Sequence, residues 1–235
     1  MHSVLVYHSI SKPAKPMPGD INISPQRFEQ QLRWLSRWRK VARLYQTLRS
    51  IENLVAITFD VGFRDNLTVA LPLLEKFNMP MTLFVTVGFI GQEGYLSADE
   101  LRQMAKHPLV TIGAHGLTHV HFNELSSEQA RFELTESRRV LEEITGMKVE
   151  LMAWPYGECT EELEMLSDEC GYRASWSLWK GSNKLHSRWR VPVGRNDDLL
   201  RFVAKVSGAS FPTKRLENKL GQLKSRFATA KSAGR

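Results

Sequence analysis

Acidic and imidazole side chains stand where strand-like segments of this sequence end. The apolar run at 54–60 ends on Asp60, and His115 and His119 follow the run at 110–114. A carboxylate can take a proton from a water molecule, and a neutral imidazole is the commonest metal ligand in proteins. Together these residue types indicate a hydrolase in which a bound metal ion and a nearby acid act on water.

The histidine pair is a weak signal when it is taken alone. His115 and His119 are four residues apart, a spacing that chance often produces and that surface or core histidines would also explain. Gly113 and Gly116 bracket the first histidine, and glycine permits an unusual backbone path at a crowded site. We therefore interpret the pair as metal ligands on a loop that follows a strand. His121 lies just beyond, and its apolar neighbours predict a structural role.

Strand-like and helix-like segments alternate along the chain. Strands are predicted at residues 4–8, 54–60, 81–87, 110–114, 151–154, 172–178 and 190–193. Helical patterns open at Ser24-Pro25, at Asn66, at the Ser97 capping box and at Ser126, and another lies between the two cysteines. This rhythm predicts an α/β fold with parallel strands inside and helices outside. The pattern alone does not separate an open sheet from a barrel. In either case the site belongs at the carboxyl ends of the strands, where His8 and Tyr156 also lie.

Composition sets broad bounds on the protein. The chain has 235 residues, 42% of them hydrophobic, which is compatible with one α/β domain. Its formal net charge of +7 favours anionic partners. We expect a catalytic domain at 1–211 and a basic tail at 212–235. The weak leucine stripe of the tail fits either a solvated, fraying helix or a contact with an anionic membrane.

Several features favour a cytoplasmic protein, at most peripheral to the inner membrane face. The N-terminus runs straight into a strand without a signal peptide, and no segment approaches the roughly 20 apolar residues of a membrane helix. Cys159 and Cys170 would lie roughly 16 Å apart across a helix, whereas a disulfide needs about 7 Å. Free thiols fit a reducing compartment. The charge is scattered and no recognition motif is present, so no nucleic-acid partner is expected.

Five short motifs occur in the order of a known family. They are Tyr7-His8-Ser9, Ser24-Pro25-Gln26-Arg27-Phe28 with Leu32, Thr58-Phe59-Asp60-Val61-Gly62, His115 with His119, and Pro155-Tyr156-Gly157. In these motifs the chain resembles the polysaccharide deacetylase family, carbohydrate esterase family four with its NodB-homology domain, in the branch with an N-terminal Tyr-His-Ser motif. The resemblance runs from residue 4 to about Arg195. It implies a distorted (β/α) barrel that removes N-acetyl groups from a poly- or oligosaccharide.

The resemblance implies roles for five residues. Asp60 would be the general base, and His115 and His119 would bind a divalent ion, zinc before any other. Tyr156 would offer its backbone N–H to the oxyanion, and His8 would protonate the leaving amine. A zinc-bound water has a pKa of about 7, so a neighbouring carboxylate can deprotonate it. The ion and one N–H group would together stabilise the tetrahedral intermediate.

One position departs from the family pattern in a way that concerns the metal. Val61 stands where the family places an aspartate ligand, and valine cannot bind a metal ion, so we expect weak metal binding. Ala153 occupies the place of an arginine that orients the base in many members. Arg190 or Arg195 could supply this charge from a later strand, and both would equally fit surface positions.

Two functions are compatible with these residues. The first is a metal-dependent N-deacetylase of an N-acetylated glycan or glycolipid, and the second is an impaired homologue that binds a glycan or a partner without turnover. Substrate-binding or supporting roles are expected for Trp154, Pro155, Gly157, Arg190 and Arg195. The clustered tryptophans Trp154, Trp176, Trp179 and Trp189 would either stack on sugar rings or pack in the core.

Overall fold

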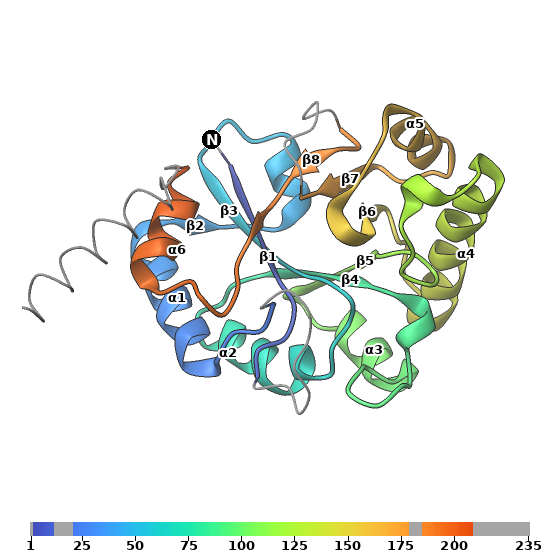
Figure 1. Ribbon diagram of the computed structural model, residues 1–235. Helices are drawn as coiled ribbons and strands as arrows, with labels where there is room; N and C mark the ends of the chain where they lie inside the picture. The colour runs from blue at the N-terminus through green and yellow to red at the C-terminus, as the bar shows by residue number, and fades with distance from the viewer. Residues whose placement is uncertain (1, 12–20, 179–184, 209–235) are drawn as a thin grey trace, which may run out of the picture.

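One sheet of parallel strands curves into a nearly closed barrel in the computed structural model (Figure 1), which describes residues 2–11, 21–178 and 185–208. The strands are β1 Ser3–Tyr7, β2 Lys40–Val41, β3 Leu54–Phe59, β4 Met81–Val85, β5 Val110–Ala114, β6 Leu151–Ala153, β7 Ala174–Ser177, β8 Arg188–Trp189 and β9 Val191–Pro192. Their order is β8-β7-β6-β5-β4-β3-β1-β9, with β2 beside β3. The predicted α/β class and distorted (β/α) barrel are confirmed.

The barrel closes through a short segment, residues 188–192. Its first part, β8, pairs with β7, and its second part, β9, pairs with β1 at the other end of the sheet. Arg190 is the residue between these two strands. The sequence pattern indicated a single strand near this place and left open whether the sheet closes. Closure places the Arg190 side chain among residues of the barrel interior, since its guanidinium lies 5.3 Å from the Phe84 ring centroid.

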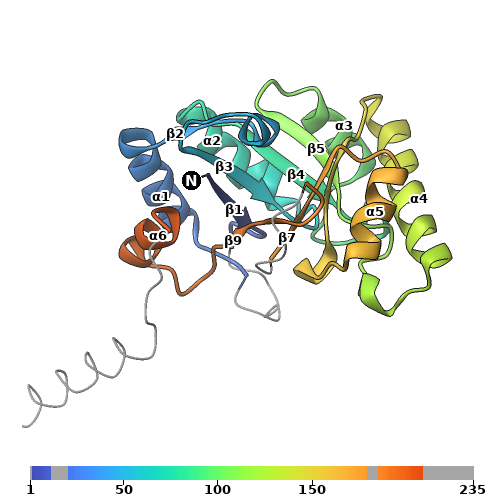
Figure 2. The same cartoon turned by 90° about the horizontal axis from the view of Figure 1, so that it is seen from above.

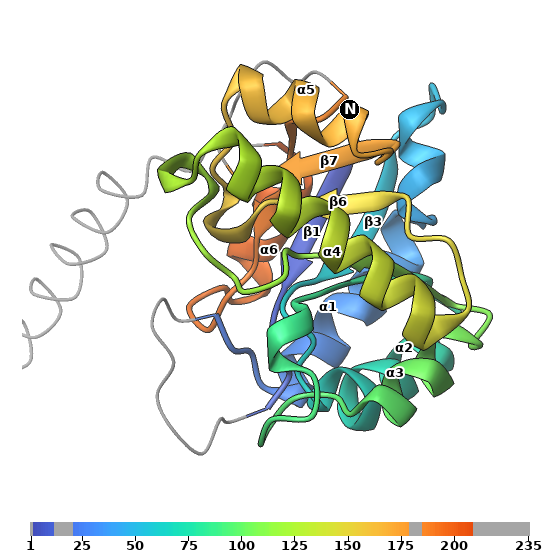
Figure 3. The ribbon, with the colours of Figure 1, turned by 90° about the vertical axis from the view of Figure 1, so that its right-hand side faces the viewer.

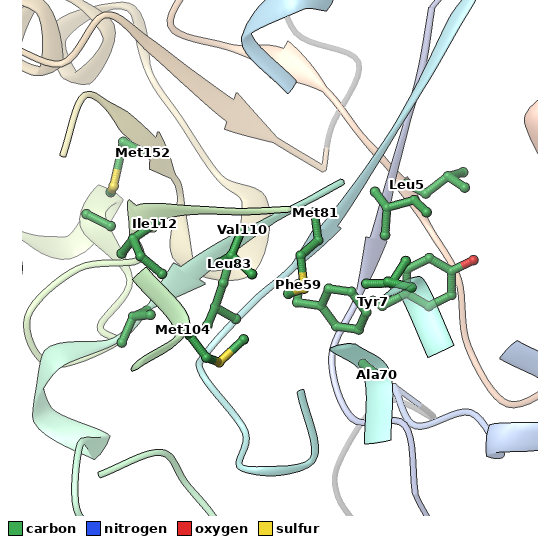
Figure 4. Close-up of a cluster of buried hydrophobic side chains, with 14 of the residues drawn as sticks. Leu5, Tyr7, Phe59, Ala70, Met81, Leu83, Met104, Val110, Ile112 and Met152 are labelled. Atoms are coloured by element: carbon green, nitrogen blue, oxygen red, sulfur yellow. The ribbon is translucent and has the colours of Figure 1, made fainter. Parts of the chain in front are cut away.

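Alternate residues of each strand pack into two different cores. The pleat sends successive side chains to opposite faces of the sheet. In β3, Ile57 and Phe59 join the larger core between strands and helices, part of which is shown in Figure 4. Ala56 joins a smaller cluster with side chains from neighbouring strands. Thr58 and Asp60 continue the face of Ala56, so the inner face becomes polar towards the carboxyl end of β3.

Helices surround the barrel (Figures 2 and 3). They are α1 Pro25–Trp38, α2 Leu71–Lys76, α3 Ala98–Ala105, α4 Ser127–Thr145, α5 Glu161–Glu169 and α6 Leu199–Val206. Short 3-10 turns span Leu44–Leu48, Val87–Phe89, Phe122–Glu124 and Pro155–Gly157, and a π turn, Asn66–Ala70, leads into α2. The predicted N-caps Ser24 and Ser97, and Ser126 before the predicted long helix, each accept a hydrogen bond from the backbone three residues on. Local capping chemistry therefore sets these helix starts.

Some parts of the fold were not anticipated. The sequence pattern missed β2 and α6, which are two and eight residues long. The predicted tail at 212–235 lies outside the described residues. Cys159 and Cys170 flank α5 as free thiols, as expected. In the part of the chain that the structure describes, no helix combines the length and the apolar character needed to cross a membrane.

Candidate active site

The structure brings the predicted polar residues together at the carboxyl ends of the strands. His8 follows β1, Asp60 follows β3 and His115 follows β5, while Tyr156 lies in the turn after β6. Asp60 Oδ2 is 3.8 Å from His115 Nε2. The ring centroid of His119 lies 5.0 Å from that of His115 and 4.9 Å from that of Tyr156. Strand ends distant in sequence thus form one cluster.

A buried arginine holds Asp60 in place. Nη1 and Nη2 of Arg190 donate to Oδ1 and Oδ2 of Asp60 over 2.6 and 2.7 Å. Asp60 is 2% exposed and Arg190 is fully buried. Burial by itself would raise the pKa of Asp60, but the charges of Arg190, His115 and His8 together with the Arg190 hydrogen bonds lower it to about 2. The carboxylate is therefore ionised and fixed in orientation at neutral pH.

Of the two arginines that the sequence offered, Arg190 supplies the charge beside Asp60. Its place in the closing segment of the barrel lets it reach inward, and its Nη1 also lies 3.3 Å from Thr58 Oγ1. Arg195 is exposed instead, and its Nη2 donates to Asn22 Oδ1 over 2.9 Å. Their places differ, because Arg190 lies between β8 and β9, whereas Arg195 follows β9.

The ring of His115 has a defined tautomer. Its Nδ1 lies 2.7 Å from the carbonyl oxygen of Ala153, which can only accept, so Nδ1 carries the proton. The lone pair is then on Nε2, facing Asp60. Burial lowers the pKa of His115 to about 3, against the opposing charge of Asp60, so the imidazole is neutral. A buried ring oriented through its second nitrogen is typical of a metal-ligating histidine.

Glu133 on α4 positions the loop between the two histidines, a role that the sequence analysis missed. Its Oε2 accepts hydrogen bonds from the backbone N–H groups of Leu117 and Thr118, over 2.7 and 3.0 Å. The carboxylate is 6% exposed. The sequence gives one indication of this role: Glu133 stands next to Leu134 on the face of the helix that is buried in the structure. An acidic residue on a buried helix face needs donors, and here the loop supplies them.

Three non-glycine residues of the site have left-handed backbone conformations. The φ angles are 77° at Val61, 62° at His119 and 58° at Tyr156. This region is sparsely populated by ordinary residues and is especially unfavourable for a β-branched side chain. Such strain costs of order 1–3 kcal/mol per residue and clusters at functional sites. Val61 is the most costly of the three, and it is also the position where the resemblance implies an aspartate.

Tyr156 forms the exposed edge of the cluster. It is 46% exposed, and its ring stacks on that of His121 with centroids 3.7 Å apart and planes at 7°. His121 Nδ1 lies 3.2 Å from Glu158 Oε2. His121, predicted to be structural because of its apolar neighbours, thus lies half-buried on the rim and supports Tyr156. Gly157 has a φ of 75° and Leu178 directly against it, which leaves no room for a Cβ atom.

Asp65 stands four residues after Val61 and is engaged elsewhere. Its Oδ2 accepts hydrogen bonds from the hydroxyls of Ser9 and Ser11, over 2.5 and 2.8 Å. The side-chain amide of Asn66 donates to the backbone carbonyl of His8 over 2.7 Å. These bonds tie the start of the π turn to the segment after β1. Asn66 therefore holds the backbone of His8, and Asp65, engaged with two hydroxyls, does not replace the missing carboxylate.

The tryptophans support the core of the barrel. Trp154 and Trp176 are fully buried. Trp154 packs edge-on against Phe122 and donates from Nε1 to the carbonyl of His186 over 3.0 Å. Full burial leaves no face for a sugar ring, so both side chains have a supporting role. Trp179 lies outside the described residues.

The donor set falls short of a complete metal site. His115 and His119 offer neutral imidazoles, because burial lowers the pKa of each. Val61 occupies the position of the third ligand that the resemblance implies. Its side chain is 7% exposed and has no lone pair. Among residues 2–11, 21–178 and 185–208, no three His, Cys, Asp or Glu side chains form a group that could hold a metal ion. The residues present therefore do not fit the three-ligand site that the resemblance implies.

Known proteins share the sequence features of this chain. The family model described as polysaccharide deacetylase matches residues 48–175. YxkH of Bacillus subtilis (strain 168), whose name also describes a polysaccharide deacetylase, is 28% identical over 178 residues, which are 72% of this chain and 62% of YxkH. The poly-beta-1,6-N-acetyl-D-glucosamine N-deacetylase of Staphylococcus aureus (strain MRSA252) is 24% identical over 200 residues, 76% of this chain and 67% of that enzyme. The chain thus spans less than two thirds of YxkH.

A solved structure shares the fold. The Streptococcus pyogenes deacetylase PplD, determined in complex with acetate, superposes with a TM-score of 0.77 at 20% sequence identity. The match covers 87% of this chain and 97% of PplD. At this identity the likeness establishes the barrel architecture.

Proposed function

Because the chain belongs to the polysaccharide deacetylase family, we propose that it hydrolyses the N-acetyl groups of an N-acetylated poly- or oligosaccharide. The name of the Staphylococcus aureus relative specifies poly-beta-1,6-N-acetyl-D-glucosamine. Oligomers of N-acetylglucosamine are therefore the first substrates to test. An amide of this kind needs an attacking water, a base for its proton and an acid for the leaving amine.

One observation carries this proposal. Asp60 Oδ2 and His115 Nε2 are both acceptors, and they face each other across 3.8 Å. The Arg190 pair keeps the carboxylate ionised and the Ala153 carbonyl keeps the imidazole lone pair turned towards it. Two fixed acceptors beside the same space favour a water molecule as their neighbour, and a water so held can lose a proton as it attacks.

The proposed reaction moves one proton through this chain's own residues. Asp60 takes it from water as the oxygen bonds to the amide carbon, and the backbone N–H of Tyr156 stabilises the oxyanion. Burial lowers the pKa of His8 to about 4, against the opposing charge of Asp60. His8 therefore starts neutral, accepts the proton from Asp60 and gives it to the amine nitrogen as the C–N bond breaks. The products are acetic acid and the free amine.

We also propose that any divalent ion, zinc before any other, contacts His115 and His119 and binds weakly. The support is the convergence of two neutral imidazoles. Val61 would leave such an ion without a third protein ligand. Loss of even an outer-sphere partner typically weakens metal affinity or activity by about 10–100-fold.

Val61 also favours a second candidate, a protein that binds the glycan without turnover. The left-handed backbone at Val61 keeps the shape of the turn while the side chain lacks a carboxylate. A site of this shape can retain affinity for an N-acetylated sugar after losing its rate, because binding and transition-state stabilisation depend on different contacts.

Acetate release from N-acetylglucosamine oligomers separates the candidates. The native chain should release acetate, with and without added zinc compared, and Asp60→Asn should abolish the release. Asp99→Asn is the matched control, because its side chain is 90% exposed on α3. Oligomer binding by calorimetry without acetate release would favour the binding protein. Neither binding nor release would contradict both candidates.

A further inference from the structure

An exposed apolar and cationic face covers one flank of the barrel. The helices α1 and α6 lie side by side there, at the left in Figures 1 and 2. We define the α1–α6 face by Trp34, Arg37, Trp38, Leu199 and Leu200. Trp38 is 64% exposed and Leu200 is 68% exposed. A shallow groove runs between Trp34, Trp38 and Leu199. Large apolar side chains at neighbouring exposed positions mark an interaction surface.

Side-chain contacts connect the two helices beneath this face. The Trp34 ring packs edge-on against buried Phe202 of α6, with centroids 6.0 Å apart. The Arg39 guanidinium lies 5.2 Å from the Trp34 ring centroid and donates to Ser207 Oγ over 3.1 Å. These contacts join the two helices within α1 and α6 and again at their C-terminal ends. The exposed side chains of the face therefore belong to two helices that pack against each other.

The charge around the α1–α6 face is positive. Arg37 is exposed and has no ion pair within the described ranges. Arg33 on the next helical turn pairs with Glu29, which also accepts from Lys76. The acid at the start of α6, Asp198, already accepts from a backbone N–H group of its own helix. An anionic surface would thus meet arginines at this face.

The chain that follows α6 adds to this charge. Residues 209–235 begin directly after the described end of that helix and contain seven Lys or Arg residues and one Glu. They account for nearly all of the formal net charge of +7. The basic segment is therefore joined in the sequence to a helix of the α1–α6 face. A second copy of this cationic chain would be repelled there, whereas an anionic surface would be attracted.

We propose that the α1–α6 face docks onto an anionic lipid membrane as a peripheral contact. Tryptophan favours the headgroup region, and the leucines enter the upper acyl layer. Arginine contributes an attraction to anionic lipid that is lost at high salt. The cluster of Asp60 and His115 lies at the strand ends and is separate from this face, so docking leaves the site free for a glycan.

Co-sedimentation of the full chain with vesicles tests the proposal. Vesicles of phosphatidylglycerol and phosphatidylcholine should bind the chain at low salt and release it at high salt, and phosphatidylcholine alone should bind weakly. Trp38→Ser/Leu200→Ser should lower the partition coefficient by about tenfold or more. Arg37→Gln should lower it by about fivefold. Phe132→Ser on α4, a residue that is 59% exposed, is the matched control and should change nothing.

Three results would overturn the docking face. The native chain could ignore anionic vesicles at low salt. Binding could be unchanged in Trp38→Ser/Leu200→Ser and in Arg37→Gln, which would assign it to residues 209–235 alone. Light scattering could show a native dimer that the double variant converts to a monomer, which would make the face an interface between copies. Arg37→Gln removes one exposed charge and keeps the test valid even if the double variant does not fold.

Discussion

The candidate site has two halves that differ although they meet at adjacent residues of the chain. On one side Asp60 is an ionised carboxylate that accepts two hydrogen bonds from the buried Arg190. On the other side His115 and His119 converge beside Val61, which has no ligand atom and a φ of 77°. We refer to these as the base side and the ligand side. The base side is held by a bidentate ion pair, and the ligand side is strained and incomplete.

The Asp60–Arg190 ion pair of the base side has a structural role as well as a proposed catalytic one. Arg190 sits in the segment that closes the barrel between β8 and β9, so the Asp60–Arg190 pair is also a structural link. Removing one member of a buried pair leaves an uncompensated charge. The presence of Asp60 therefore has a structural reason besides a catalytic one. Whether the protein turns over a substrate is therefore better tested at the ligand side, which lacks such an ion pair between its residues His115, His119 and Val61.

The largest effect is expected from breaking the base side. Arg190→Met should lower the free energy of unfolding by about 3–5 kcal/mol, because it leaves the Asp60 carboxylate buried and unpaired. Urea unfolding followed by circular dichroism measures this loss. Arg139→Met is the control, since that side chain is 59% exposed and makes only surface ion pairs.

The double variant Asp60→Asn/Arg190→Met sharpens this result. It should cost less than Arg190→Met alone, because no unpaired charge remains. If Arg190→Met were as mild as the Arg139→Met control, the pair would have no structural role, and the presence of Asp60 would again count in favour of turnover.

Completing the ligand side is expected to have the next largest effect. Val61→Asp should raise zinc affinity by about 10–100-fold or more, because it adds a carboxylate beside two neutral imidazoles. Equilibrium dialysis measures the affinity, and acetate release should appear or increase in the same variant. Asp60→Asn on this background should remove the activity and keep the metal.

Val61→Asn is the matched control for that experiment. Asparagine tolerates the left-handed conformation and has nearly the same shape as aspartate, but it carries no charge. Its zinc affinity should stay close to that of the native chain. Equal zinc affinity in Val61→Asp and the native chain would show that the site is not organised around this position, and glycan binding without turnover would then take precedence.

A smaller effect follows from the backbone of the ligand side. Val61→Asn should raise the free energy of unfolding by about 1 kcal/mol, because a β-branched residue at a φ of 77° is strained and asparagine is less so. Thermal unfolding of the two proteins at the same pH provides the measurement. A loss of stability would mean that the valine side chain contributes more by packing than its backbone costs.

A separate effect, confined to acidic pH, concerns how the stability of the base side depends on pH. Burial lowers the pKa of His8 to about 4 in the folded chain, below its ordinary value of 6.5. Above pH 6.5 His8 is neutral in both states and has no effect. Between pH 6.5 and about 4 the unfolded chain binds a proton that the folded chain does not, so stability falls as the pH falls. Unfolding of His8→Gln should show a shallower slope in this window, and an unchanged slope would contradict the shift.

Much of the architecture could be predicted because it depends on local chemistry. The strand predicted at 110–114 is β5, and its apolar residues Val110, Ile112 and Ala114 are buried in the larger core. The helix starts after Ser24, Ser97 and Ser126 follow from side chains that cap their own backbone. Short elements such as β2 were missed, because two residues carry no periodicity.

The sequence by itself determined which chemical groups stand at the strand ends and that Val61 interrupts the set of metal ligands that the resemblance implies. The tertiary structure decided which distant groups meet them. In the folded chain Arg190, and not Arg195, is the partner of Asp60, and Glu133 accepts hydrogen bonds from the loop between the two histidines. The physical reason is that these contacts depend on how the barrel closes and how α4 packs, and no local pattern encodes either.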